Sequence, residues 1–255
     1  NRRRNLKRNT DNYIKFLLPL IILIIWFLGT NIGKIPETAL PKLGTVIRTF
    51  KEMIKSGQLY SDLGISMRRV IAGYVISSIL GVTLGVIMGI SRKAKKTFQF
   101  TLTSMRQIPM IAWIPLIILW TGIGEISKIT VILFAATFPI VVNTVNGIES
   151  TPEAFLEVAE IYKLNRWDTF FKVYLPSALP NIFTGLRLGL STSWMAVVAS
   201  ELIASSSGIG YRLNDARSLM KSDTVIVCMI VIGIVGVLMD KMIVLAAEIS
   251  TDWKN

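Results

Sequence analysis

Apolar stretches recur along the chain and are separated by shorter polar segments. A helix that crosses a hydrocarbon core of ~30 Å needs about 20 mostly apolar residues, and six stretches fit this pattern. They lie within 1–30 and at 70–90, 98–122, 127–147, 178–204 and 224–247. The pattern predicts an all-α, polytopic membrane protein with six transmembrane helices.

The polar segments divide the chain into four predicted regions. These are a cytoplasmic N-terminus with the first transmembrane helix (1–30), an outer connection with an amphipathic helix ending at Gly57 (31–69), a core of five transmembrane helices (70–247) and a cytoplasmic tail (248–255). Tight basic clusters at 2–8 and 92–96 place both termini in the cytoplasm; the outer connection is also basic, but its charges are spread out. A signal peptide is the alternative for the first apolar stretch, but no small-x-small cleavage site follows it.

The second and third spans carry patterns of their own. Small residues recur every four positions in the second span and predict a seam where another helix packs closely. They are Gly73, Ser77, Gly81, Gly85 and Gly89. In the third span, Pro109 and Pro115 are expected to kink or break the helix, because proline removes a backbone donor and clashes with the preceding turn.

The composition agrees with a membrane protein and excludes several kinds of chemistry. The chain is 52% hydrophobic, with a net charge of +12. Its Lys and Arg gather at the ends of apolar stretches, so contact with anionic lipid explains them better than nucleic acid. The absence of His and the single Cys exclude His-based catalysis, His-ligated metals, disulfides and Cys metal sites. We therefore expect no catalytic residue, no metal and no cofactor on this chain.

The loop at 150–176 predicts a pair of short helices rather than a flexible connection. Thr151-Pro152-Glu153 predicts the first start, with a hydroxyl N-cap and proline at the first helical position. Asn165 is expected to cap the second helix, with Asp168 three residues on, and Leu175-Pro176 to stop it. The apolar face of the second helix comprises Trp167, Phe170, Phe171 and Tyr174. Such a pair either lies on lipid or on its own bundle, or docks to a soluble partner.

The residues of this loop resemble a known signature. Glu157-x-Ala159, a turn, and then Leu175-Pro176 are similar to the EAA loop of bacterial ABC-importer permeases. In that family the loop is the coupling helix that sits in a groove of the cytoplasmic ATPase. Lys163 stands where the family usually has Gly; a Lys at positive φ costs on the order of 1 kcal/mol.

Other stretches resemble one branch of that family, which serves nitrate, taurine, aliphatic sulfonates, bicarbonate and some vitamin precursors. The matching stretches are Ser66-x-x-Arg69-Val70-x-x-Gly73-Tyr74, Gly81 to Gly89 with Ser91-Arg92-Lys93, Ile108-Pro109-x-x-Ala112-Trp113-x-Pro115-Leu116, Gly122 to Lys128, Phe138-Pro139 and Ala199-x-Glu201 to Tyr211. The resemblance implies a type I importer permease fold in the bacterial inner membrane. It also implies a second permease copy, two cytoplasmic ABC ATPase subunits that bind ATP and Mg, and an extracytoplasmic solute-binding protein.

Two sets of candidate residues follow. The resemblance assigns contact with the ATPase to Glu157, Ala159, Tyr162, Lys163 and Arg166. Polar and ionisable residues within spans usually face a cavity or a neighbouring helix, and they suggest a translocation path formed by Asn143, Arg187, Ser191, Thr192, Ser193 and Glu201. Near the outer face, Arg68, Arg69 and Arg212 would suit an anionic solute.

The function that we expect is import of a small anionic solute of the nitrate, sulfonate, taurine or bicarbonate type. A vitamin precursor, of the thiamine-pyrimidine or riboflavin type, is the alternative cargo. A secondary transporter would need buried acid or His relays or inverted repeats, of which we find one candidate acid, Glu201. A membrane enzyme would need a convergent catalytic set on the spans, and none is visible.

Overall fold

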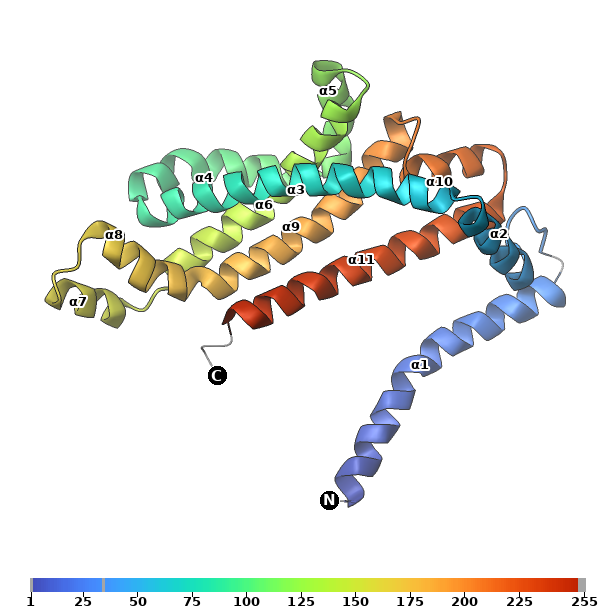
Figure 1. The fold of residues 1–255 in the computed structure, drawn as a ribbon, viewed down its shortest axis with the longest axis horizontal. Coiled ribbons are helices and arrows are strands. Elements are labelled where there is room, and N and C mark those ends of the chain that lie inside the picture. Colours follow the sequence, from blue (N-terminus) through green and yellow to red (C-terminus); the bar gives the residue numbers. More distant parts are fainter. Residues whose placement is uncertain (1, 34, 252–255) are drawn as a thin grey trace. The chain divides into compact units, whose positions relative to one another are not determined.

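The computed structural model describes the backbone of residues 2–33 and 35–251 and the side chains of 17–33 and 35–248. Every regular element in these residues is a helix (Figure 1). The helices are α1 (Arg2–Asn31), α2 (Leu43–Lys55), α3 (Gln58–Ile90), α4 (Arg92–Gln107), α5 (Met110–Thr121), α6 (Glu125–Glu149), α7 (Glu153–Ile161), α8 (Arg166–Thr169), the π-helical turn η1 (Phe170–Tyr174), α9 (Leu175–Ala204), α10 (Ile209–Ser218) and α11 (Ser222–Thr251).

The chain forms two compact units. The smaller unit comprises the chain up to Tyr60 together with Arg212–Ile230. Its α2 buries Val46, Thr49 and Met53, and the Thr49 hydroxyl donates to the carboxylate of Asp223. The predicted amphipathic helix ends as expected, because Gly57 follows α2 with φ +74°.

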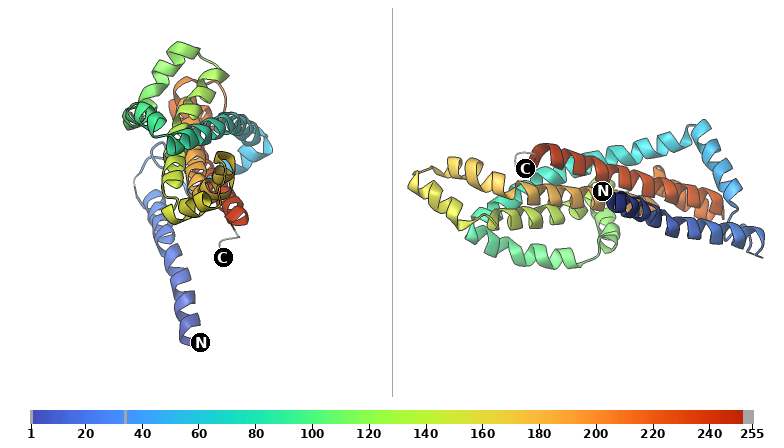
Figure 2. Two further views of the ribbon diagram at one scale, coloured as in Figure 1. Left: turned by 90° about the vertical axis from the view of Figure 1, so that its left-hand side faces the viewer. Right: turned by 90° about the horizontal axis from the view of Figure 1, so that it is seen from below.

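The larger unit comprises Ser61–Tyr211 and the chain from Val231, and its centre is the packing of α3, α6 and α9. Helices α6 and α9 run side by side (Figures 1 and 2). The small-residue ridge of α3 faces α6: a Cβ added at Gly73 or Gly85 would lie 2.6 Å from Ile132 or 2.5 Å from Thr144. On α9, Gly185 and Gly189 meet α6 at Asn143 and Ile140 in the same way. Small residues thus let three helices approach closely where there is no water to drive association.

Four helical stretches in the described residues are long and apolar enough to cross a membrane, and a broken pair would make five. They are Gln58–Ile90, Glu125–Glu149, Arg166–Ala204 and Ser222–Glu248. The apolar part of α1, Leu17–Asn31, is shorter. The polar segment before residue 70 is helical from Gln58 onward, so the second predicted span begins in the middle of a longer helix.

Of the two prolines predicted to kink or break the span at 98–122, Pro109 breaks the helix and Pro115 does not. Helices α4 and α5 meet at Ile108-Pro109 with a bend of 103°, which is visible in Figure 1. A residue that precedes proline is pushed out of the helical region, and Ile108 is extended, with φ −78° and ψ 121°. Pro115 lies inside α5 without ending it.

The prediction that Leu175-Pro176 stops a helix is wrong. Helix α8 continues through η1 into α9, and together they form one stretch from Arg166 to Ala204. Proline in an α-helix clashes with the carbonyl four residues earlier. The wider turn of η1 stands directly before Pro176 and makes room for the ring, as π-turns inside α-helices do at irregular positions.

We predict that the α3–α6 seam is sensitive to a single methyl group. Gly85→Ala should lower the free energy of unfolding by about 1–3 kcal/mol, because its Cβ overlaps Thr144 in a packed seam. Gly64→Ala in the same helix has nothing within 4 Å of its Cβ and should be neutral or stabilising by up to ~1 kcal/mol. Denaturant unfolding of the purified variants measures both values. Equal effects at the two positions would contradict close packing.

Candidate functional site

Helices α7 and α8 form a compact elbow between α6 and α9. The first helix begins one residue later than predicted: Pro152 occupies the N-cap position, and Thr151 lies outside the helix. The second start is confirmed, because the Asn165 side chain accepts a hydrogen bond from the Asp168 amide at 2.8 Å. Asp168 itself pairs with Lys172 at 2.7 Å rather than closing a capping box.

The turn of the elbow is a Schellman motif with Lys163 in the left-handed position. Lys163 has φ +50°. Its amide donates to the Glu160 carbonyl at 2.9 Å, and the Leu164 amide donates to the Ala159 carbonyl at 3.0 Å. These two bonds satisfy carbonyls that the end of a helix leaves free. The structure therefore retains the positive φ where Gly would avoid strain.

The elbow exposes a large apolar surface. Five of its aromatic and aliphatic side chains are more than half exposed: Phe155 56%, Ile161 76%, Tyr162 75%, Trp167 75% and Phe171 56%. Trp167 and Phe171 stack with ring centroids 6.3 Å apart, which holds part of this surface rigid. An exposed apolar surface on a rigid frame marks a site that contacts lipid or protein.

Of the residues predicted to contact an ATPase, Glu157, Tyr162, Lys163 and Arg166 are exposed. Ala159 is only 4% exposed, so it packs inside the elbow. Phe170, which follows α8, packs against Ile148, Ala178 and Ile182. The elbow is thus anchored in the contact between α6 and α9.

A second cluster joins charges from three helices of the larger unit and reaches from the interior to the surface, where the Glu125 side chain is 63% exposed. Arg69 of α3 is 3% exposed and lies between Glu125 of α6 and Glu201 of α9. Its Nη1 donates to Glu201 Oε1 at 2.7 Å, and its Nε donates to Glu125 Oε2 at 2.8 Å. Lys128, also 3% exposed, lies on α6 one turn beyond Glu125. Two cations therefore balance two carboxylates.

Hydrogen bonds engage the rest of the Glu201 carboxylate, which is 1% exposed. The Ser66 hydroxyl contacts both of its oxygens, at 2.8 and 2.9 Å, and the Gly210 amide donates to Oε2 at 2.9 Å. Gly208 has φ +102°, and a Cβ there would overlap the carboxylate. Glycine in the α9–α10 turn therefore allows the backbone to close over Glu201.

Three of the stretches singled out by resemblance meet in this cluster: Ser66 to Arg69, Gly122 to Lys128 and Glu201 to Gly210. Their spacing along the chain gave no sign of it. Glu201 was predicted to line a translocation path, but its burial and its full set of partners favour a structural role. Arg69 is occupied in the same way, whereas Arg68 beside it is exposed.

The other predicted path residues differ in their surroundings. Asn143 and Thr192 line a cavity of about 530 Å³ between α5, α6 and α9. Ser191 and Ser193 donate to carbonyls of their own helix, and Ser193 is fully buried. Arg187 pairs with Asp240 of α11, Nε to Oδ1, at 2.5 Å.

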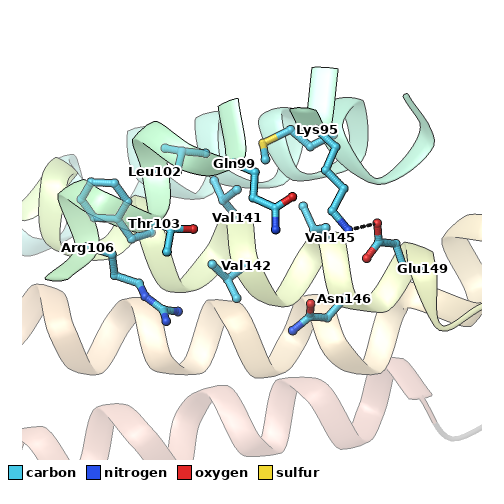
Figure 3. A pocket seen from close by; sticks show the side chains of 12 residues that line it. Lys95, Gln99, Leu102, Thr103, Arg106, Val141, Val142, Val145, Asn146 and Glu149 are labelled. Atoms are coloured by element: carbon cyan, nitrogen blue, oxygen red, sulfur yellow. Dashed lines mark hydrogen bonds and ion pairs between the residues drawn. The ribbon is translucent and has the colours of Figure 1, made fainter. Parts of the chain in front are cut away.

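A smaller cavity of about 170 Å³ lies between α4 and α6 (Figure 3). Lys95 of α4 and Glu149 of α6 form an ion pair at one end, with Nζ and Oε1 2.5 Å apart. Gln99, Thr103 and Asn146 add polar groups to its walls. The two cavities share Arg106, Phe138 and Val142, so they adjoin along α6. Arg106 and the adjoining cavities were not predicted from the sequence.

We predict that the stability of the larger unit depends on Arg69. Arg69→Met leaves Glu201 buried without its cation and should cost on the order of 3–5 kcal/mol of stability. Arg69→Met combined with Glu201→Met should recover much of that loss, because the unpaired charge is removed. Arg68→Met is the matched control, since Arg68 is the adjacent, exposed arginine. Thermal unfolding in detergent measures the series. A double variant no more stable than Arg69→Met would contradict the pairing.

We also predict that Lys163→Gly relieves strain. The variant should stabilise the elbow by up to ~1 kcal/mol, because glycine adopts positive φ without a steric penalty. Lys172→Gly, in the helical turn η1, should have the opposite sign. Hydrogen exchange of the α7 and α8 amides measures both. Faster exchange in Lys163→Gly would show that the lysine side chain contributes more than its backbone costs.

Comparisons with known proteins agree with this architecture. Residues 81–247 match the family described as binding-protein-dependent transport system inner membrane component. The chain is 38% identical over 239 residues to a putative aliphatic sulfonates transport permease protein, SsuC, of Bacillus subtilis, covering 94% of this chain and 87% of that protein. It is 31% identical over 232 residues to the nitrate import permease protein NrtB of a Synechocystis species, covering 88% and 83%.

A solved structure shares the fold. The crystal structure of an amino acid ABC transporter with histidines superposes with a TM-score of 0.64, at 15% identity, covering 78% of this chain and 97% of that one. Permeases of this family have no catalytic activity of their own. The chain belongs to the inner-membrane permease family of binding-protein-dependent ABC importers.

Proposed function

We infer that this chain is the transmembrane subunit of an importer for a small anion and that its elbow docks into a cytoplasmic ATPase. The observation that carries the proposal is the elbow itself. It joins an exposed apolar surface and an exposed Glu157 to a rigid Schellman turn. A surface of this kind suits a groove on a partner protein.

The membrane arrangement that accompanies this proposal has six spans and both termini in the cytoplasm. Four long helices, the bent pair α4–α5 and the apolar part of α1 supply six apolar segments. The basic residues at 92–96 then share the cytoplasmic side with the elbow. The complete importer has two copies of this permease, two ATPase subunits that bind ATP and Mg, and a solute-binding protein outside.

The continuous stretch from Arg166 to Ala204 gives a direct route for coupling. Closure of the ATPase subunits on ATP displaces the elbow. Because α8, η1 and α9 form one uninterrupted helical rod, that displacement reaches Thr192 and Met195, which line the larger cavity. The cavity is thereby opened and closed by a rigid element with two positions, which is how coupling between distant sites operates.

An anionic solute is supported by two observations. Relatives of this chain are described as sulfonate and nitrate permeases. In addition, the described residues that line the larger cavity include no acid and one base, Arg106. Ionisable groups facing a cavity within a membrane protein mark the route of its substrate.

We predict that Glu157→Lys uncouples ATP hydrolysis from transport. Reversing one exposed charge at the docking surface should lower uptake by at least about tenfold, the effect of losing ~1.4 kcal/mol of contact energy, while the permease stays folded. Glu52→Lys is the control, because Glu52 is an exposed glutamate on α2, outside the elbow. The measurement is solute uptake and ATP hydrolysis by the complete complex in proteoliposomes, with ethanesulfonate and nitrate as labelled solutes.

Cross-linking provides the direct test of docking. Tyr162→Cys in a Cys228→Ala background should cross-link to the ATPase subunit, because Tyr162 is 75% exposed. Absence of a cross-link to a nucleotide-hydrolysing partner, together with normal coupled uptake by Glu157→Lys, would overturn the assignment of the elbow.

A further inference from the structure

The break between α4 and α5 brings two side-chain donors to the wall of the larger cavity. Arg106 lies in the last turn of α4, and Trp113 lies in the first turn of α5. Both line the cavity, although a bend of 103° separates their helices. In a straight helix these two positions would share one face but lie roughly 10 Å apart along its axis, because seven residues make about two turns. With the helix broken at Pro109, one cavity is lined by residues from both sides of the bend.

Arg106 is the only charged residue that lines this cavity in the described part of the chain. Its side chain is exposed. Two other arginines of the larger unit form ion pairs. Arg69 pairs with Glu125 and Glu201, and Arg187 pairs with Asp240. The structure gives Arg106 no hydrogen bond or ion pair with any described residue.

The nearest carboxylate in the adjoining cavity does not neutralise Arg106. Glu149 lines the smaller cavity, but its Oε1 is paired with Lys95 at 2.5 Å. Figure 3 shows Arg106 and the Lys95–Glu149 pair at opposite ends of this cavity. The net charge at the junction of the two cavities is therefore positive. An unneutralised cation in a low-dielectric cleft raises the local concentration of anions.

Trp113 offers a second donor. The indole N–H groups of Trp26 and Trp194 donate to the carbonyls of Pro41 and Ile232, at 2.9 and 3.0 Å. The Trp113 Nε1 is buried and has no partner in the structure. A buried donor without an acceptor costs about 1–3 kcal/mol, so the indole gains if a ligand in the cavity supplies an acceptor.

The remaining walls suit a small apolar body. Met110, Phe134, Phe138, Leu188 and Met195 line the cavity together with prolines and alanines. A volume of about 530 Å³ holds a small molecule with some water. Tight binding is not required of a translocation site, because a solute must also leave it.

We propose that Arg106 and Trp113 form an anion-selective site at the junction of the two cavities. Arg106 supplies the charge that admits anions, and the Trp113 indole N–H supplies a directional donor when the ring turns toward the ligand. The occupant is a small organic anion with a charged oxyacid group and a short apolar part. This proposal rests on the function proposed above, since it specifies the site through which that solute passes.

The charge of the cavity can be measured without knowledge of the solute. Met195 lines the cavity and is 70% exposed, so Met195→Cys in a Cys228→Ala background provides a reporter thiol. Its rates of modification by an anionic and a cationic methanethiosulfonate of similar size are compared in the full-length chain in detergent. With Arg106 present, the anionic reagent should be favoured. Arg106→Gln should lower the anion-to-cation rate ratio by roughly tenfold.

Two controls separate a local effect from a global one. Arg92→Gln, at the other end of α4 and outside both cavities, should leave the ratio at Met195→Cys unchanged. Thr97→Cys in the Cys228→Ala background places a thiol on α4 outside both cavities. Its anion-to-cation rate ratio should be the same with Arg106 and with Arg106→Gln. A ratio at Met195→Cys that is the same with Arg106 and with Arg106→Gln would overturn the proposal.

Uptake by the complete complex in proteoliposomes tests the role in transport. With ethanesulfonate as the labelled solute, Arg106→Gln should lower uptake at least about tenfold, the equivalent of ~1.4 kcal/mol. Arg106→Lys should retain more, because it keeps the charge, and ATP hydrolysis should continue in both. Trp113→Phe should raise the KM more than it lowers the maximal rate. Unchanged uptake in Arg106→Gln would also overturn the site.

The outcomes distinguish a failure of the anion site from a failure of the proposed importer function. If the thiol ratio responds to Arg106→Gln but the complete complex takes up neither ethanesulfonate nor nitrate, the anion site stands and the proposed cargo fails. If uptake is coupled to ATP and the thiol ratio does not respond, the importer assignment stands and the site fails. If Arg106→Gln does not fold, Arg106→Met removes the same charge in the rate-ratio measurement, and Trp113→Phe tests the second donor through the KM.

Discussion

The architecture of the larger unit depends on the pairing of the buried Arg69 with two carboxylates, Glu201 in the interior and Glu125 at the surface. Leaving either Arg69 or Glu201 alone at such depth would cost several kcal/mol, so the two must remain in contact. Since they sit on α3 and α9, and Glu125 sits on α6, the contact fixes three helices at one end. Ser66 and the Gly208–Gly210 turn complete the coordination of Glu201. A polar cluster of this kind tolerates only one arrangement, because each partner left unsatisfied carries a penalty.

The remaining length of the same three helices is held by shape instead of charge. The glycines of α3 and α9 admit Ile132, Ile140, Thr144 and Ile148 of α6 at distances that any Cβ would exclude. Ionic contacts at one end and close packing along the rest make α3, α6 and α9 a single rigid body. The elbow is attached directly to that body through Phe170 and the rod of η1 and α9. A push on the elbow is therefore expected to move α3, α6 and α9 together against α4 and α5, which form the other wall of the larger cavity.

Local signals predicted the elements well and their junctions less well. The alternation of apolar and polar segments predicted the helices, and the Asn165 cap was confirmed. Proline was harder to interpret, because its effect depends on what surrounds it: Pro109 breaks a span, Pro115 does not, and Pro176 is accommodated by a π-turn. The early start of α3 was missed because Ser66 and Arg69 look like loop residues, although both are buried partners of Glu201. Contacts such as Arg69–Glu201 span 132 residues, and no periodicity within one helix can indicate them.

Two charged residues show that a sequence pattern can indicate where an important residue lies without indicating what that residue does. Glu201 and Arg106 are both ionisable residues close to apolar spans. Glu201 is enclosed and has hydrogen-bond partners on both oxygens. Its charge therefore stabilises the fold and is not available to a solute. Arg106 stands at a proline break beside two adjoining cavities, without a partner among the described residues. A charge that is already neutralised cannot attract a solute, whereas an unneutralised one in a cleft does so over several ångströms. The residue that acts on a passing anion is therefore one whose charge the protein leaves unneutralised, and among the described residues that line the larger cavity that residue is Arg106.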